Sequence, residues 1–76
     1  MNDNVAIVNL NNGKVIVYDN FKNATYDELE NTIIFQAKTG AYANSLKVVE
    51  YDSIESLVLP KGDYDYRIVK LMKEIG

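Results

Sequence analysis

The fifteen residues VAIVNLNNGKVIVYD, numbers 5–19, contain two β-branched runs on either side of a short polar segment. Asn12-Gly13 is a strong hairpin signal, because both central residues of a tight two-residue turn take positive φ. The stretch therefore predicts an antiparallel hairpin between residues 5–10 and 14–19. With Asn12-Gly13 as the turn, three pairs face the core: Leu10 with Val15, Val8 with Val17, and Ala6 with Asp19.

The second face of this hairpin is unusually apolar away from its turn. In the same register, Asn9 lies opposite Ile16 and Ile7 lies opposite Tyr18. A hairpin with one solvated face should alternate apolar and polar residues along its whole length. We therefore expect this face to be covered by another part of the chain or bound by a partner.

A helix is expected next, over residues 26–39. Thr25 and Glu28 have the spacing of a capping box, and Gly40 is well placed to end the helix in a left-handed conformation. One buried stripe follows the i, i+4, i+8 spacing of a helix: Leu29, Ile33 and Ala37. The run at residues 32–35 has β propensity and argues against the helix locally.

The middle of the chain predicts a third strand over residues 46–52, which read LKVVEYD. Residues 53–56 are expected to form a short turn of helix or an irregular link. This link leads into another short β-forming run at residues 57–59.

The final segment begins with a turn signal, because Pro60 and Gly62 stand at the positions that a type I turn favours. Residues 64–71 are expected to return as a strand, although helical spacing there also fits a short C-terminal helix. The predicted fold is a single α+β domain over residues 1–76. It has the order ββαβββ, with one helix packed on one face of an antiparallel sheet.

Composition excludes several classes of function. The 76 residues include no cysteine and no histidine, and no serine lies in a strand-to-helix elbow, so we expect no enzyme. The four glycines are isolated and build no phosphate loop, so no cofactor is expected. Asp63 and Asp65 begin like a calcium loop, but Tyr66-Arg67 follows instead of further ligands, so no metal is expected.

Charge and hydropathy limit the partners. The net charge of −3 predicts no direct nucleic-acid binding, because proteins that bind phosphate backbones are usually basic. No apolar run is long enough for a signal peptide or a membrane span, so we expect a cytoplasmic protein without a membrane partner.

Acidic residues cluster toward the C-terminal half of the chain. Residues 50–65 contain one basic residue, Lys61, and five acidic residues: Glu50, Asp52, Glu55, Asp63 and Asp65. In a strand, residues i and i+2 lie on one face about 6.6 Å apart, which is of the order of the spacing between neighbouring phosphates. The pairs Glu50/Asp52 and Asp63/Asp65 would have this spacing, which suggests that the protein mimics a nucleic acid.

These patterns predict a protein-protein interaction surface. Its apolar and tyrosine patch is expected to contain Ile7, Ile16, Tyr18, Tyr64 and Tyr66. Its acidic rim is expected to contain Glu50, Asp52, Asp63 and Asp65. The expected partner is a protein with a basic surface. The alternatives are a homodimer or assembly component that is closed by the same patch, and a small enzyme with an unrecognised carboxylate site.

The chain resembles, in general character only, the small acidic accessory proteins of phages or plasmids in low-GC bacteria. The resemblance rests on its content of asparagine and tyrosine and carries no motif. It implies an inhibitor that binds a host or defence protein, and it transfers no site residue.

Overall fold

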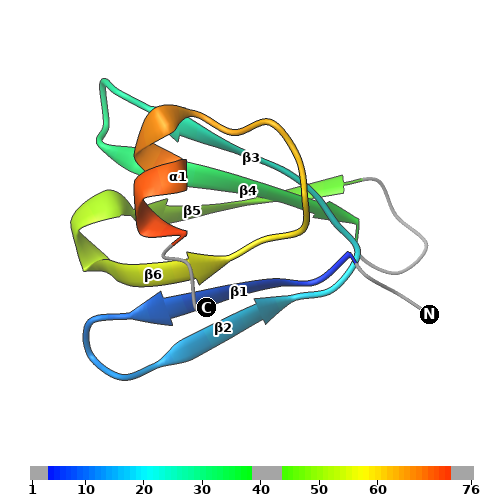
Figure 1. The fold of residues 1–76 in the computed structure, drawn as a ribbon, viewed down its shortest axis with the longest axis horizontal. Helices are drawn as coiled ribbons and strands as arrows, with labels where there is room; N and C mark the ends of the chain where they lie inside the picture. Colours follow the sequence, from blue (N-terminus) through cyan, green and yellow to red (C-terminus); the bar gives the residue numbers. More distant parts are fainter. Residues whose placement is uncertain (1–3, 39–43, 73–76) are drawn as a thin grey trace.

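The computed structural model describes residues 4–38 and 44–72, which form two three-stranded antiparallel sheets and one short helix (Figure 1). Sheet A has the order β2-β1-β6, with β1 at Ala6–Leu10, β2 at Val15–Tyr18 and β6 at Ile54–Val58. Sheet B has the order β3-β4-β5, with β3 at Phe21–Asp27, β4 at Thr32–Lys38 and β5 at Asn44–Glu50. The 3₁₀ helix η1, Tyr51–Ser53, joins β5 to β6, and the helix α1, Tyr66–Leu71, follows β6.

The fold is therefore mostly β, roughly consistent with the α+β class, but the expected order ββαβββ is wrong. The helix expected over residues 26–39 is replaced by the end of β3, a turn and β4. Ile33 and Ala37 of the expected buried stripe lie on the inner face of β4, because a spacing of four residues is even and also fits one face of a strand. Leu29, the third member, lies in the turn and is exposed rather than buried. Gly40, the expected end of that helix, lies outside the described residues.

The first hairpin is confirmed, but its register differs by one residue from the expected one. Ala6 pairs with Tyr18 and Val8 pairs with Ile16. The turn has three residues rather than two, and Gly13 adopts a φ of +92° while its N–H donates to the carbonyl oxygen of Leu10 at 3.0 Å. This is a type I turn followed by a glycine bulge. Because side chains alternate along a strand, the shift exchanges the two faces of β2.

The chain passes from one sheet to the other between β2 and β3. Asn20 takes a φ of +56° at this corner, a left-handed conformation that asparagine tolerates better than most residues. Phe21 then begins β3, and its N–H donates to the carbonyl oxygen of Asn4 at 2.8 Å. The two sheets thus meet at a corner made by consecutive residues (Figure 1).

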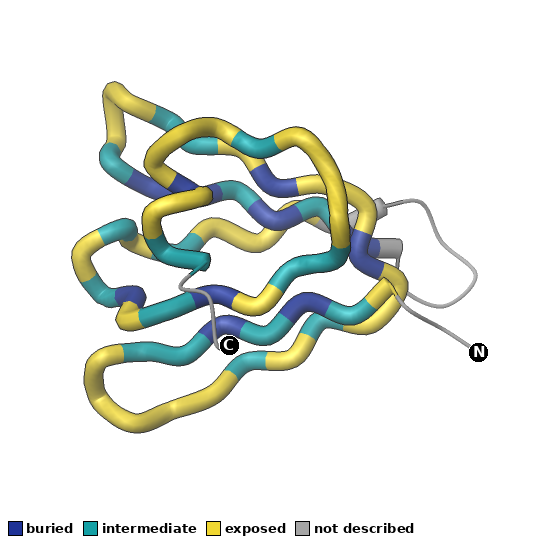
Figure 2. The backbone as a smooth tube through the Cα atoms, viewed as in Figure 1, coloured by how far each residue is buried: buried dark blue, intermediate teal, exposed yellow. Residues whose placement is uncertain are grey.

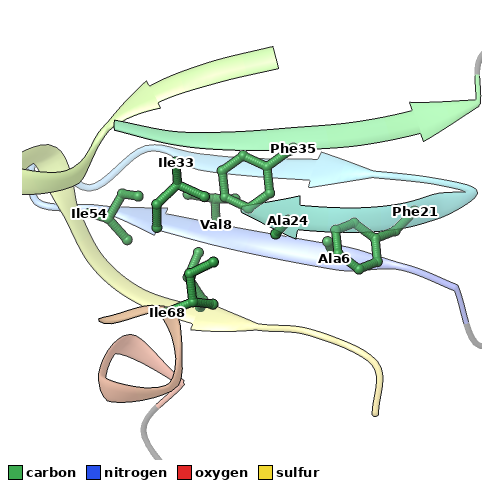
Figure 3. Close-up of a cluster of buried hydrophobic side chains, with 9 residues drawn as sticks. Ala6, Val8, Phe21, Ala24, Ile33, Phe35, Ile54 and Ile68 are labelled. Carbon is green, nitrogen blue, oxygen red and sulfur yellow. The ribbon is translucent and has the colours of Figure 1, made fainter. Parts of the chain in front are cut away.

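The core lies between the inner faces of the two sheets (Figures 2 and 3). Its buried side chains come from four strands and from α1: Ala6, Val8, Phe21, Ala24, Ile33, Phe35, Ile54, Leu57 and Ile68. The alternation of buried and half-buried residues along β1 and β4 gives each strand one inner face. The largest fully buried side chain is Phe35.

The last third of the chain differs most from expectation. β6 pairs with β1 instead of forming a second hairpin, and residues 61–72 contain no strand. The strand expected over residues 64–71 is wrong, and the alternative of a short helix is confirmed as α1. Asp65 caps α1 by accepting a hydrogen bond from the N–H of Arg67 at 2.8 Å. Ile68 is the one residue of α1 that is buried.

Candidate functional site

The structure does not bring the five residues of the expected apolar and tyrosine patch together. Ile16 and Tyr18 pack against the core, and the ring centroid of Tyr18 lies 5.4 Å from that of Phe35. Burial raises the pKa of Tyr18 above its ordinary value of 10.0. Tyr64 also packs against the core, and its hydroxyl donates to the carbonyl oxygen of Pro60 at 2.6 Å.

The other two members of that patch lie on separate surfaces. Ile7 is half-buried on the outer face of sheet A. Tyr66, at the start of α1, is 73% exposed. A Cβ at Gly62 would lie 3.1 Å from the hydroxyl of Tyr64, so a larger residue there would force the Tyr64 side chain to shift. The alternating hexapeptide at residues 62–67 is thus a tight link and a helix start rather than a strand.

The acidic residues, in contrast, partly converge. The β3–β4 turn, η1 and the start of α1 meet at one end of the molecule (Figure 1). The N–H of Tyr51 donates to the carbonyl oxygen of Asn31 at 3.0 Å, and the Asn31 amide donates to the Asp52 carboxylate at 3.3 Å. The Tyr51 hydroxyl donates to the carbonyl oxygen of Arg67 at 3.0 Å. These bonds tie three segments that are distant in sequence.

We call the carboxylates of these segments the acidic end: Asp27, Glu28, Glu30, Glu50, Asp52 and Asp65. Among the described residues, none of the six forms an ion pair. Two cations of α1 border them, and each lies over a tyrosine ring. The Arg67 guanidinium is 4.8 Å from the ring centroid of Tyr26, and the Lys70 ammonium is 5.5 Å from that of Tyr66. Six carboxylates against two cations give this region a formal charge of −4.

The structure does not contain the two strand-spaced acidic pairs that the sequence suggested, Glu50 with Asp52 and Asp63 with Asp65. The spacing expected along a strand is wrong, because Asp52 lies in η1 and both Asp63 and Asp65 lie in the link between β6 and α1. Asp63 is exposed on that link. The strand geometry that suggested a nucleic-acid mimic is therefore absent at these described residues.

The β3–β4 turn has a defined shape. The Asp27 carboxylate accepts hydrogen bonds from the N–H groups of Leu29 at 3.0 Å and Glu30 at 3.4 Å. Asn31 takes a φ of +56°, and its side-chain oxygen accepts a hydrogen bond of 2.5 Å from the Tyr26 hydroxyl. Leu29 at the tip is 95% exposed between two glutamates. The turn thus presents an apolar side chain with a negative charge on either side.

A shallow depression of about 250 Å³ separates this turn from α1. Its lining consists of Tyr26, Glu28, Asp65, Tyr66 and Arg67. Interaction with Tyr26 raises the pKa of Arg67 most, and the nearby carboxylates of Glu28 and Asp65 add smaller contributions. The depression is lined by tyrosine rings and carboxylates, with a guanidinium already over one ring.

The outer face of sheet B leads from apolar residues to the acidic end. In register, Ile34 of β4 lies beside Val48 of β5, and the next outward row ends in Glu50. Leu46 is 63% exposed and Val48 is 61% exposed. We call Ile34, Leu46 and Val48 the β5 strip. Leu46 and Val48 thus lie exposed along the edge strand β5 and lead to Glu50, while Ile34 is half-buried beside them on the central strand β4. Asp27 lies at the other end of the Glu50 row, on β3.

Sequence reasoning missed several of these residues, notably Tyr26, Leu29, Tyr51 and Arg67. The first two were assigned to the expected helix, where they would lie far from η1. A signal was present in DELEN, residues 27–31, because Asp and Asn at the two ends of a short polar segment favour a turn between strands.

Within the described parts of the chain, no group of three or more acidic, histidine or cysteine side chains could hold a metal ion. The helices described there are too short and too polar to cross a membrane. No protein-family model, curated protein or solved structure matches this chain.

Proposed function

We propose that this chain is a non-enzymatic protein-protein interaction module that binds a basic surface of another protein. Its binding surface consists of the acidic end and the β5 strip. The observation that carries the proposal is the convergence of six carboxylates from three separate segments, next to exposed aliphatic side chains. Within residues 4–38 and 44–72, these carboxylates form no ion pair. The partner in this proposal is a protein that the chain inhibits, in keeping with the general character of the sequence.

Electrostatics supports a basic partner. Carboxylates held together in a folded protein repel one another, and a surface with the opposite charge relieves this repulsion while steering the encounter. Arg67 and Lys70 stand over aromatic rings, and within the described residues neither forms an ion pair with these carboxylates.

The apolar residues beside the acids supply the second element of a protein interface. Interfaces combine a desolvated apolar centre with a polar rim, and the apolar part provides most of the affinity. Val48 and Leu46 form such a centre on the outer face of sheet B, and Glu50 lies at its border. A small organic ligand would need an enclosed pocket, whereas this surface is open.

The test uses a defined probe, a synthetic amphipathic peptide with alternating lysine and leucine residues. We expect backbone NMR signals of residues 27–31 and 46–52 to shift on titration with the peptide. The shifts should decrease at high salt, because ions screen exposed charges over about 10 Å at 0.1 M. Shifts that are spread over the whole protein, or that are insensitive to salt, contradict the proposal.

Matched variants separate this site from net charge. Glu28→Gln with Glu50→Gln removes two charges from the acidic end, and Glu55→Gln with Asp63→Asn removes two exposed charges elsewhere. At about 0.2–1 kcal/mol per exposed ion pair, the first variant should weaken peptide binding by about twofold to thirtyfold. Equal weakening by both variants would assign the binding to net charge and reject the site.

A further inference from the structure

The loop of the first hairpin contains the pair Asn12-Gly13, and no other asparagine of the chain precedes a glycine. Both residues are exposed, as is the rest of the loop. Asparagine is a thermolabile residue, because the backbone nitrogen of the next residue can attack its side-chain amide. Glycine has no Cβ to hinder this approach. The loop therefore presents to water the pair of residues best suited to the reaction.

We propose that Asn12 is a site of spontaneous deamidation that the folded loop holds closed. In this reaction, the Gly13 backbone nitrogen gives its proton to water and bonds to Cγ of Asn12. The Cγ–Nδ2 bond breaks, and the leaving nitrogen takes up a proton as ammonia. Water then opens the resulting cyclic imide by breaking one of its two ring C–N bonds, which leaves aspartate or isoaspartate. The chain has exchanged ammonia for water, and neither an oxidant nor a cofactor is needed.

Two hydrogen bonds hold the reacting groups in the folded loop. The Gly13 N–H, which supplies the attacking nitrogen, donates to the carbonyl oxygen of Leu10 at 3.0 Å. The side-chain oxygen of Asn12 accepts from the N–H of Lys14 at 2.9 Å. The first bond must break before the nitrogen can give up its proton, and the second must break for the side chain to rotate. Attack therefore requires a local opening of the loop.

The loop is also tied to η1, a segment far away in the sequence. The Asn11 N–H donates to the carbonyl oxygen of Ser53 at 2.9 Å, and the Asn11 side-chain amide donates to the carbonyl oxygen of Asp52 at 2.8 Å. An opening of the loop strains or releases these bonds as well. Tertiary contacts therefore protect Asn12, and its rate of reaction reports how often the loop opens.

Deamidation changes the charge next to the acidic end. Either product adds one carboxylate, which takes the net charge from −3 to −4. Asn12 and Asp52 line the same depression of about 260 Å³, so the new charge lies near one of the six carboxylates. Aspartate keeps an acceptor for the Lys14 N–H, whereas isoaspartate adds a carbon atom to the backbone of the loop and disrupts its geometry. The proposal does not depend on the proposed function, because mass and not binding is measured.

Mass spectrometry of peptides from the full chain tests the proposal. The chain is incubated in mildly alkaline buffer, either folded or in guanidinium chloride, and each asparagine is followed over time. In denaturant, Asn12 should react before every other asparagine. In the folded protein it should react about fivefold to 150-fold more slowly, the factor that corresponds to two hydrogen bonds. Faster reaction at another asparagine in denaturant, or equal rates at Asn12 in the two states, overturns the proposal.

Two variants separate the chemistry from the protection by the fold. In denaturant, Gly13→Ala should slow the reaction at Asn12, because the added methyl group hinders attack, and folding does not enter this measurement. Asn11→Ala removes the bond to the Asp52 carbonyl oxygen and should speed the folded reaction by about twofold to tenfold, with the denatured rate unchanged. The matched control is Asn23→Ala, which removes an exposed asparagine of β3 and should change neither rate. An unchanged rate in the Gly13 variant rejects the chemistry, and an unchanged folded rate in the Asn11 variant rejects the protection.

Discussion

The docking of α1 can be tested at a single side chain, Ile68. A six-residue helix has no stability of its own, because helix nucleation is unfavourable and short helices depend on tertiary packing. Ile68 is fully buried, so it should hold α1 against β3 and β6. Ile68→Ala should therefore destabilise the whole domain rather than only fray its end.

The expected magnitude follows from the burial. The substitution removes three carbon atoms from a side chain with 0% exposure, which costs about 2.4 kcal/mol at 0.8 kcal/mol per buried methylene. The cavity left behind brings the expected loss to about 3–4 kcal/mol. A domain of this size has a free energy of unfolding of about 4–11 kcal/mol, so the variant should lose a large part of it. The midpoint of thermal unfolding should fall by more than about 10 °C.

Urea unfolding followed by tyrosine fluorescence provides the assay, because the chain has six tyrosines and no tryptophan. The matched control is Val69→Ala, a neighbour in the same helix that is 49% exposed. This control should cost less than about 1 kcal/mol. If the two variants differ by less than about 1 kcal/mol, the side chain of residue 68 does not anchor the helix and the reasoning fails.

Three other predictions concern the turn, the helix cap and pH. Gly13→Ala should cost about 1–2 kcal/mol in thermal unfolding, because residue 13 has a left-handed backbone although a Cβ there would meet no other atom within 4 Å. Asp65→Ala should cost about 1 kcal/mol in urea unfolding, because it removes the acceptor for the N–H of Arg67, whereas Asp65→Asn should restore most of the loss. Burial raises the pKa of Tyr18 and of Tyr64, so the folded protein holds these protons more tightly than the unfolded chain does. Stability should be complete below about pH 10 and fall as pH rises through the folded pKa values, and Tyr18→Phe should reduce that fall in urea midpoints measured from pH 8 to 12.

Local signals predicted the hairpin but not its register. Asn12-Gly13 predicted the position of the turn correctly. It did not predict the length of the loop, because two-residue and three-residue hairpin loops both favour asparagine and glycine. The one-residue difference turned Ile16 and Tyr18 inward and Val17 outward. An apolar outer surface was therefore expected correctly, but its residues on β2 were assigned to the wrong face.

The acidic end was only partly predictable. Glu50, Asp52 and Asp65 were expected at a binding surface, but their convergence with Tyr26 and Arg67 depends on contacts between segments far apart in sequence. Periodicity describes only neighbours along the chain, and an even spacing fits both a helix stripe and a strand face. The prediction therefore assigned residues 28–31 to a helix, although they form the β3–β4 turn that belongs to the acidic end.

The pairing of β1 with β6 has a consequence for the order of folding. The hydrogen bond between Asn9 and Ser56 joins residues 47 positions apart, whereas the β3–β4 turn closes a loop of four residues. Closing the longer loop costs about 2 kcal/mol more in chain entropy. We therefore expect β3, β4 and β5 to assemble first and β6 to dock late. During synthesis, one edge of β1 stays unpaired until residues 54–58 have been made. In that interval, the exposed edge of the first hairpin can pair with strands of other chains.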